Sequence, residues 1–166
     1  AEFSLAYRDV FALELPMAPP PELARGLDSS RQAERTRLVD SPRVMHRIRL
    51  GNSNAFPLTT APALILRDER LLAQGLLTYA APGAQADLTL TPVVDVRVVK
   101  DDHETKRVPN AAVWQGDSYG RVDLAGDLTL TSYRKEPIEV EVTRHVLGNV
   151  LTADSGGRSE MVNVFE

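Results

Sequence analysis

The feature that most constrains the fold of this chain is the alternation of apolar and polar residues with a period of two. The pentapeptide Asp-Leu-Thr-Leu-Thr shows it twice, at Asp87–Thr91 and at Asp127–Thr131. Successive side chains of a β-strand point to opposite faces, so this period is that of a half-buried strand. Similar alternation recurs over Val44–Leu50 and Ile138–Thr143. We interpret the twin pentapeptides as one strand pattern used twice, with Leu inward and Thr outward, rather than as a duplication.

Turn signals separate the alternating runs, and helical periodicity is almost absent. Pro82–Gly83 and Gly156–Gly157 predict turns, and Lys100–Lys106 is interpreted as a charged turn. Leu88–Val98 could form one long strand, in which Pro92 predicts a bulge or an edge position. Many short strands of this kind predict an all-β protein: an antiparallel, immunoglobulin-like β-sandwich with few or no helices.

Two segments share a further pattern, in which a strand and a polar turn precede a proline that opens the next strand. One contains Pro57 after the strand Arg47–Leu50, and the other contains Pro137 after Leu128–Thr131. Proline is tolerated at the first residue of a return strand, because it has no N–H to donate there. Both segments are therefore predicted to be hairpins of the sandwich.

The N-terminal part of the chain differs from the rest. Residues 1–21 are predicted to form a strand, with Tyr7, Phe11, Leu13 and Leu15 on one face, followed by a proline-rich connector. Residues 22–166 are predicted to hold the β-sandwich domain. Within them, the polar stretch that includes Ser29 and Gln32 is either a loop or a short helix opened by a capping box.

Composition excludes several classes of protein. The chain has 166 residues, a net charge of −4 and no cysteine. The acidic balance argues against a nucleic-acid-binding module. Without cysteine there are no disulfides, thiolate nucleophiles or iron–sulfur clusters. No apolar run approaches the ~20 residues of a membrane-spanning helix, and no glycine-rich phosphate loop is present. We therefore predict neither membrane insertion nor a cofactor.

The start of the chain and its arginines lead to two further expectations. Because Ala1 follows no basic and apolar leader, we expect a processed protein or a fragment of a longer one. Arginines are concentrated between Arg25 and Arg49. A patch there could meet an anionic partner, but solvated side chains on a loop and on one strand face are the simpler interpretation.

One motif suggests catalysis. Gly116–Gly120 matches G-x-S-x-G, and Asp127 and His145 follow Ser118 in the chain order of α/β-hydrolases. That motif needs a helix directly after the serine, whereas the residues after Ser118 alternate as a strand. A glycine-rich hairpin turn is therefore the preferred interpretation. No catalytic residue is predicted, and a serine hydrolase is only the weakest alternative.

The histidines and their acidic neighbours do not predict a metal site. Asp101–Glu104 brings three carboxylates and an imidazole together, but adjacent residues of a turn do not converge on one ion. His46 has the apolar parity of its strand and is expected to be partly buried and hydrogen-bonded. His145 ends a strand and is expected to be exposed.

Two aromatic residues are candidates for contact with a ligand or a partner. Trp114 and Tyr119 flank the turn Gln115–Ser118. Exposed aromatic side chains beside a loop can form a platform for carbohydrate or peptide. The alternative for a lone tryptophan is to fill the core.

One stretch resembles a known family. His46–Ala63 reads His-Arg-Ile-Arg-Leu-Gly-Asn-Ser-Asn-Ala-Phe-Pro-Leu-Thr-Thr-Ala-Pro-Ala. It resembles uncharacterised, mucoidy-inhibitor-A-like bacterial proteins, whose domain of unknown function has a strand, an Asn and then Pro-Leu-Thr-Thr-Gly-Pro-Ala; here Ala61 replaces the Gly. Ala73–Gly75 and the Leu128–Val142 segment fit the same pattern, and the resemblance covers about Val44 to Gly157. It implies a β-rich part of a larger envelope-associated, periplasmic or secreted protein and carries over no catalytic residue.

The sequence thus favours a non-enzymatic β-sandwich module that mediates protein association or acts as a spacer in a larger bacterial protein. Exposed strand edges are natural docking sites, because they accept an added strand. The alternatives are a carbohydrate- or peptide-binding module that uses Trp114 and Tyr119, and a hydrolase that uses Ser118. The expected partner is another protein or the rest of the parent chain, and the oligomeric state stays open.

Overall fold

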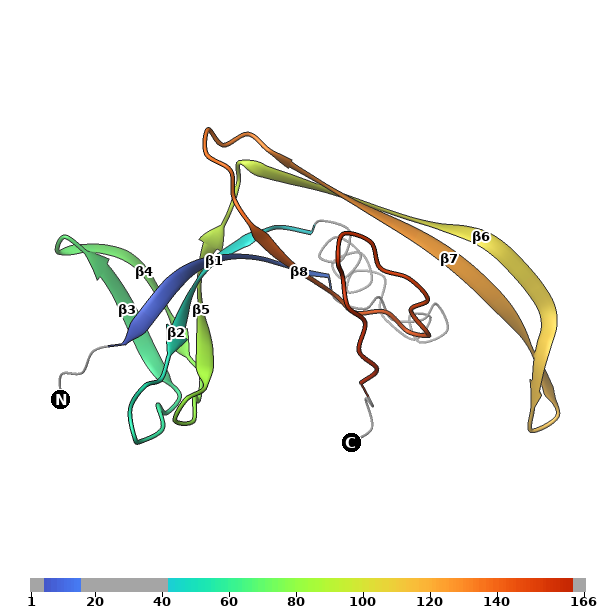
Figure 1. Ribbon diagram of the computed structural model, residues 1–166, viewed down its shortest axis with the longest axis horizontal. Helices are drawn as coiled ribbons and strands as arrows, with labels where there is room; N and C mark the ends of the chain where they lie inside the picture. Colours follow the sequence, from blue (N-terminus) through green and yellow to red (C-terminus); the bar gives the residue numbers. More distant parts are fainter. Residues whose placement is uncertain (1–4, 16–41, 163–166) are drawn as a thin grey trace, which may run out of the picture.

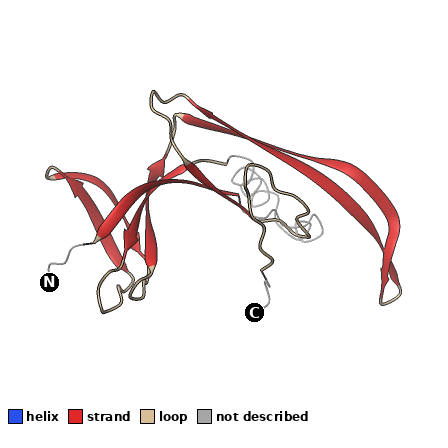
Figure 2. Cartoon of the chain, in the orientation of Figure 1, coloured by secondary structure: helices blue, strands red, loops and turns tan. Residues whose placement is uncertain are grey.

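The computed structural model describes residues 5–15 and 42–162, and within them every regular element is a β-strand (Figures 1 and 2). The strands are β1 (Ala6–Leu15), β2 (Met45–Gly51), β3 (Ala61–Arg67), β4 (Arg70–Leu77), β5 (Gln85–Pro92), β6 (Val96–Trp114), β7 (Asp117–Ser132) and β8 (Val140–Arg144). The prediction of an all-β chain is confirmed for this part. The predicted proline-rich connector and the stretch with Ser29 and Gln32 lie outside the described residues.

The strands form one four-stranded sheet and two hairpins. The order in the large sheet is β5-β2-β1-β8, and β3 with β4 and β6 with β7 form separate two-stranded sheets. All pairs are antiparallel except β1 with β8, which is parallel with Phe11 opposite Val140. The structure is therefore mostly antiparallel, with one mixed sheet.

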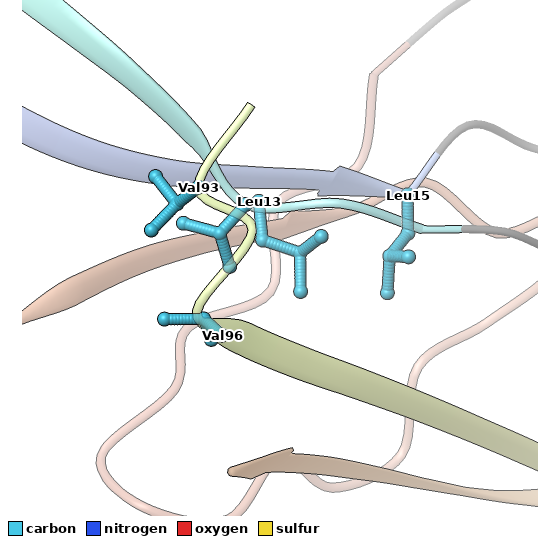
Figure 3. Packing of buried hydrophobic residues seen from close by; sticks show 5 residues of the cluster. Leu13, Leu15, Val93 and Val96 are labelled. Carbon is cyan, nitrogen blue, oxygen red and sulfur yellow. The ribbon is translucent and has the colours of Figure 1, made fainter. Parts of the chain in front are cut away.

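The main core forms where β1 meets the base of the β6–β7 hairpin. Leu13 and Leu15 have the same parity on β1 and are 0% and 2% exposed. They cluster with Val44, Val93 and Val96 (Figure 3). Burying one such side chain stabilises the fold by about 1.5–3 kcal/mol. The apolar face predicted for the first strand is thus confirmed at Leu13 and Leu15, which fix the base of the hairpin against the large sheet, whereas Tyr7 of the same parity is 66% exposed.

A second, smaller core lies under the loop that follows β2. Leu58, Ala80 and Ala86 are buried together there. Asn52 is 1% exposed, and its amide nitrogen donates to the carbonyl oxygens of Phe56 and Ala80, both at 3.0 Å. A buried amide must have its hydrogen bonds satisfied. Asn52 therefore holds the loop closed from inside.

The twin pentapeptides occupy equivalent positions in two different strands. In β5, Leu88 is buried and Leu90 half-buried, and in β7 Leu128 and Leu130 are half-buried. All four threonines are exposed. The prediction of Leu inward and Thr outward is confirmed for both copies.

Two predictions about the middle of the chain are wrong. Lys100–Lys106 is not a turn, because its residues pair across with β7 inside the 19-residue strand β6. The run Leu88–Val98 is not one strand either, since β5 ends at Pro92 and the chain turns before Val96. Pro92 lies in β5, which is an edge strand, as predicted. The pairing of β5 with β2 shifts register close to Pro92, between His46 and Arg47.

The two segments predicted to be hairpins are not hairpins. β2 pairs with β1 and β5, and the strand after Pro57, β3, pairs with β4. After Pro137 the chain enters β8, which pairs with β1 and not with β7. The predicted turns at Gly83 and Gly156 are confirmed, with φ of 78° and 73°.

Candidate functional site

The long hairpin of β6 and β7, here called the arm, is the most distinctive surface of the molecule (Figure 1). Its strands contain 19 and 16 residues and pair from Val96 opposite Ser132 to Trp114 opposite Asp117, with register shifts after Glu104 and after Val108. Only its base contributes to the main core, through Val96, Val98, Leu128 and Leu130. Beyond the base the arm is a two-stranded ribbon that extends away from the large sheet.

A two-residue turn closes the arm and exposes both aromatic candidates. Gln115 and Gly116 have φ of 52° and 89°, as both central residues of a type I′ turn require. Trp114 is 63% and Tyr119 is 52% exposed. Trp114 lies opposite Asp117, and Asp117 precedes Tyr119 by two positions on β7. Both aromatic side chains therefore belong to the same face of the ribbon. Trp114 therefore does not fill the core.

The G-x-S-x-G motif lies in this turn, as the hairpin interpretation predicted. Ser118 is the second residue of β7, and a strand follows it, not the helix that a nucleophile elbow needs. Its hydroxyl donates to Asn110 Oδ1 at 2.7 Å. Asn110 has φ of 53° within an irregular stretch of β6, where residues between Val108 and Ala112 lie opposite Gly120. The serine therefore helps to order a bulge.

The structure does not bring the three hydrolase-like residues together. Ser118 and Asp127 are nine positions apart on β7, which is about 30 Å in an extended strand. His145 follows β8, where its N–H donates to the carbonyl oxygen of Leu15, and its side chain is exposed as predicted.

The acidic cluster Asp101–Glu104 is divided between the two faces of β6. Asp102 accepts from Arg144 at 2.6 Å and lies 2.9 Å from Lys100 Nζ. Burial raises the pKa of Asp102, but the hydrogen bonds from Lys100 and Arg144 outweigh it and lower that pKa overall. Opposite Asp102 stands Gly126, where an added Cβ would collide with the Arg144 guanidinium. The Arg144–Asp102 pair thus ties β8 to the arm.

Further along the same face, the guanidinium of Arg107 donates twice to Glu104, at 2.9 and 2.6 Å, and lowers the pKa of that carboxyl. Among the described residues no group of three His, Asp or Glu side chains is placed to hold a metal ion.

A network of ion pairs covers the outer face of the large sheet, and sequence reasoning did not foresee it. Arg49 donates to both oxygens of Asp87 at 2.7 Å and to Glu141 at 2.8 Å. Arg47 donates to Glu14 at 2.7 Å. These bonds join all four strands of the sheet, so the pairing indicates a structural role.

His46 is on the other face of this sheet and agrees with its prediction. Its Nε2 lies 2.7 Å from Asp9 Oδ1, and its ring stacks on Phe11 with centroids 5.2 Å apart. The side chain is 27% exposed. His46 is thus the partly buried, hydrogen-bonded histidine that its strand parity predicted.

A shallow groove lies at the base of the arm, between the start of β2 and the β5–β6 turn. Its volume is about 310 Å³, and its lining residues are Pro42, Arg43, Pro92, Val93, Val94, Val96, Arg97 and Val98. Six of these lining residues are valine or proline, and the other two are arginines. Nothing in the alternation of the sequence indicated it, because it forms between segments that are far apart in the chain.

Comparisons of the chain with models of protein families, with curated proteins and with solved structures found no match. None of the elements in the described residues is a helix that is long and apolar enough to cross a membrane.

Proposed function

We propose that this chain is a protein-association module and that the arm is its docking element. The observation that carries this proposal is the exposure of the outer half of the arm, where large apolar side chains face solvent. They are Val113 (73%), Trp114 (63%), Tyr119 (52%), Val122 (40%) and Leu124 (71%). An isolated two-stranded ribbon is only marginally stable in water. A partner that covers these side chains would stabilise the arm and remove apolar surface from water.

The backbone of the arm supports the same proposal. Within the described part of the chain, neither β6 nor β7 pairs with a strand other than its neighbour in the arm. Each therefore offers a row of N–H and C=O groups to an added strand, and edges of this kind dock extended segments of partners. The proposed module is non-enzymatic.

A shortened arm tests the proposal. Glu104 and Leu124 lie opposite each other, so Thr105–Asp123 can be replaced by a two-residue Asn-Gly turn without moving the base of the arm. We expect the shortened chain to keep a cooperative unfolding transition and to lose binding to the rest of its parent protein and to itself, measured by pull-down of purified pieces and by sedimentation velocity. Leu64→Ser, which changes an exposed leucine of β3, is the matched control. Undiminished binding by the shortened chain would reject the arm as the docking element.

A second candidate function is the binding of carbohydrate or extended peptide at Trp114 and Tyr119, favoured by their exposure on one face of the arm. Trp114 is the only tryptophan of the chain, so its fluorescence reports on this face alone. Titration with oligosaccharides and peptides should shift the emission, and Tyr119→Ala should weaken the effect. Tyr133→Ala is the control, since Tyr133 is also exposed but follows the end of β7. An unchanged spectrum throughout rejects this candidate.

We also propose an immunoglobulin-like sandwich as the architecture of the domain. It is supported by the packing of the apolar face of β1 against the base of the arm, as one layer on another. An experimental structure tests it: a sheet of three or more strands should face the large sheet across Leu13 and Leu15, and a two-stranded arm alone at that face would reject it.

The family is a separate proposal. The motif His46–Ala63 supports membership among the mucoidy-inhibitor-A-like proteins and, with it, an envelope-associated, periplasmic or secreted location. The reading frame around this segment tests the idea, because unrelated neighbouring domains would speak against it.

A further inference from the structure

The tip of the arm places an apolar ring beside a free carboxylate. Trp114 and Asp117 are the cross-strand pair that flanks the turn, so their side chains share one face. Trp114 is 63% exposed, and Asp117 is exposed as well. Within the described residues Asp117 forms no ion pair, unlike Asp102 and Asp123 further down the arm. The tip thus presents an exposed aromatic ring and a carboxylate, and the carboxylate has no ion-pair partner inside the described part of the chain.

The groove at the base of the arm has the opposite character. Six of its lining residues are valine or proline, and one of them, Val94 in the β5–β6 turn, is 95% exposed. Arg43 and Arg97 line it, and neither makes an ion pair with a described residue. Arg47 and Arg49, by contrast, each contact carboxylates on the neighbouring strands. The groove therefore offers apolar residues together with positive charge that no described residue neutralises.

The tip of the arm cannot reach the groove of the same copy. β6 runs from the groove at Val96 to the tip at Trp114, a length of about 60 Å in an extended strand. Figure 1 shows the tip at the far end of the arm from the β5–β6 turn. Among the described residues, neither surface therefore finds its complement in the same copy, and a second molecule can supply both.

We propose that the tip of one copy docks in the groove of a second copy, with Trp114 on its apolar residues and Asp117 paired with Arg97. This inference rests on the proposed function and names a second copy of the chain as the partner. The contact joins two different surfaces, so repetition yields a ring or an open chain of molecules and not a twofold dimer. A groove of this size holds one side chain and buries little area, so the association is weak and dependent on concentration. It also weakens with salt, because the paired charges are near the surface.

Charge reversal tests the contact. Sedimentation velocity over a range of concentrations should show the wild type moving from monomer to larger species. Asp117→Arg and Arg97→Asp should each raise the concentration needed by about tenfold or more, and Trp114→Ala should do the same. The double variant Asp117→Arg/Arg97→Asp restores an opposite-charge pair and should recover most of the association. Arg70→Asp, at an exposed arginine of β4, is the control and should behave as the wild type. Circular dichroism checks that each variant is folded.

The outcomes separate this inference from the proposed function. A chain that stays monomeric at every concentration but binds its parent protein through the arm overturns the second copy and leaves the arm as a docking element. Self-association that is indifferent to Asp117→Arg and Trp114→Ala, but lost in Leu64→Ser/Leu76→Ser, assigns the contact to the β3–β4 hairpin and also overturns the inference. Failure of the double variant to recover, when both single variants dissociate, rejects the Asp117–Arg97 pair.

Discussion

At the scale of single residues, the outer face of the large sheet is held by charges that find their partners across strands. The hydrogen bond from Arg49 lowers the pKa of Asp87, and the hydrogen bond from Arg47 lowers that of Glu14. The hydrogen bonds that Arg49 donates to Asp87 and Glu141 raise the pKa of Arg49. Arg49 and Asp87 side chains are only 18% and 25% exposed, so water screens this pair less than an ordinary surface ion pair.

Asp87→Asn should therefore destabilise the protein and change how its stability depends on pH. We expect a loss of about 1–3 kcal/mol at pH 7, because a half-buried guanidinium loses a charged acceptor. An unfolded Asp titrates near 3.9, and the folded carboxyl of Asp87 titrates lower, so the unfolded state binds more protons between the two values. The contribution of Asp87 is thus complete above about pH 5 and is lost as the pH falls through the folded pKa.

Urea unfolding between pH 3 and pH 7 measures this effect. The wild type should lose stability more steeply toward low pH than Asp87→Asn does. Glu139→Gln removes the same charge from an exposed side chain that forms no ion pair among the described residues. It should shift the free energy of unfolding by less than about 0.5 kcal/mol. Parallel pH profiles for the wild type and Asp87→Asn would contradict the assignment.

The sequence predicted one half of this network. Alternation placed Arg47 and Arg49 on the outer face of their strand, as solvated side chains. It did not place their partners, because Asp87 and Glu141 are 38 and 92 positions away from Arg49. Which strands become neighbours decides which charges meet, and period-two patterns carry no information about neighbours.

At the scale of elements, the two hairpins close with turns of the same shape but different residues. The arm uses Gln115 and Gly116, whereas the β3–β4 hairpin uses Asp68 and Glu69, with φ of 50° and 62°. Glycine adopts positive φ at no steric cost, and a side chain there costs about 1 kcal/mol or more. At the second position of the turn, Glu69 therefore carries backbone strain that Gly116 does not.

Glu69→Gly should stabilise the protein by about 1 kcal/mol, because it relieves a positive φ at the second position of a type I′ turn. Gly116→Ala is the matched opposite change. An added Cβ there would meet nothing within 4 Å, so its cost of about 1 kcal/mol is conformational alone. Thermal unfolding should show one midpoint rising and the other falling. A lower midpoint for Glu69→Gly would mean that its side chain stabilises the hairpin in a way that its backbone does not reveal.

The strands themselves were largely predictable, and their pairing was not. Alternation located the strands near Val44–Leu50 and Leu128–Thr131, and proline and glycine located most turns. The predicted return of Ile138–Thr143 onto β7 is wrong, because β8 pairs with the edge of β1 and leaves the second edge of β7 unpaired among the described residues. The charged run Lys100–Lys106 lacks the apolar alternation of a half-buried strand, because both faces of the ribbon are largely exposed there, so its sequence indicates a turn although it lies in β6.

At the scale of the whole molecule, stability is concentrated at one end. The main core joins β1 to the base of the arm, and the outer arm adds no side chain to either core among the described residues. Regions with few buried contacts open locally at low cost, independently of global unfolding. The outer arm should therefore be the least protected long strand pair of the described structure.

Hydrogen exchange followed by mass spectrometry checks this distribution. At low protein concentration, amides of Ala112–Arg121 should exchange at least tenfold faster than those of Val10–Leu15, because ribbon hydrogen bonds lie open to water and β1 hydrogen bonds do not. Raising the concentration should slow exchange at the tip and beside the groove together, if tips dock in grooves. In Asp117→Arg both should stay at their low-concentration rates. Equal protection of the tip and β1 at every dilution would mean that the outer arm is stabilised within a single copy. That result would contradict the proposal that a partner covers the arm.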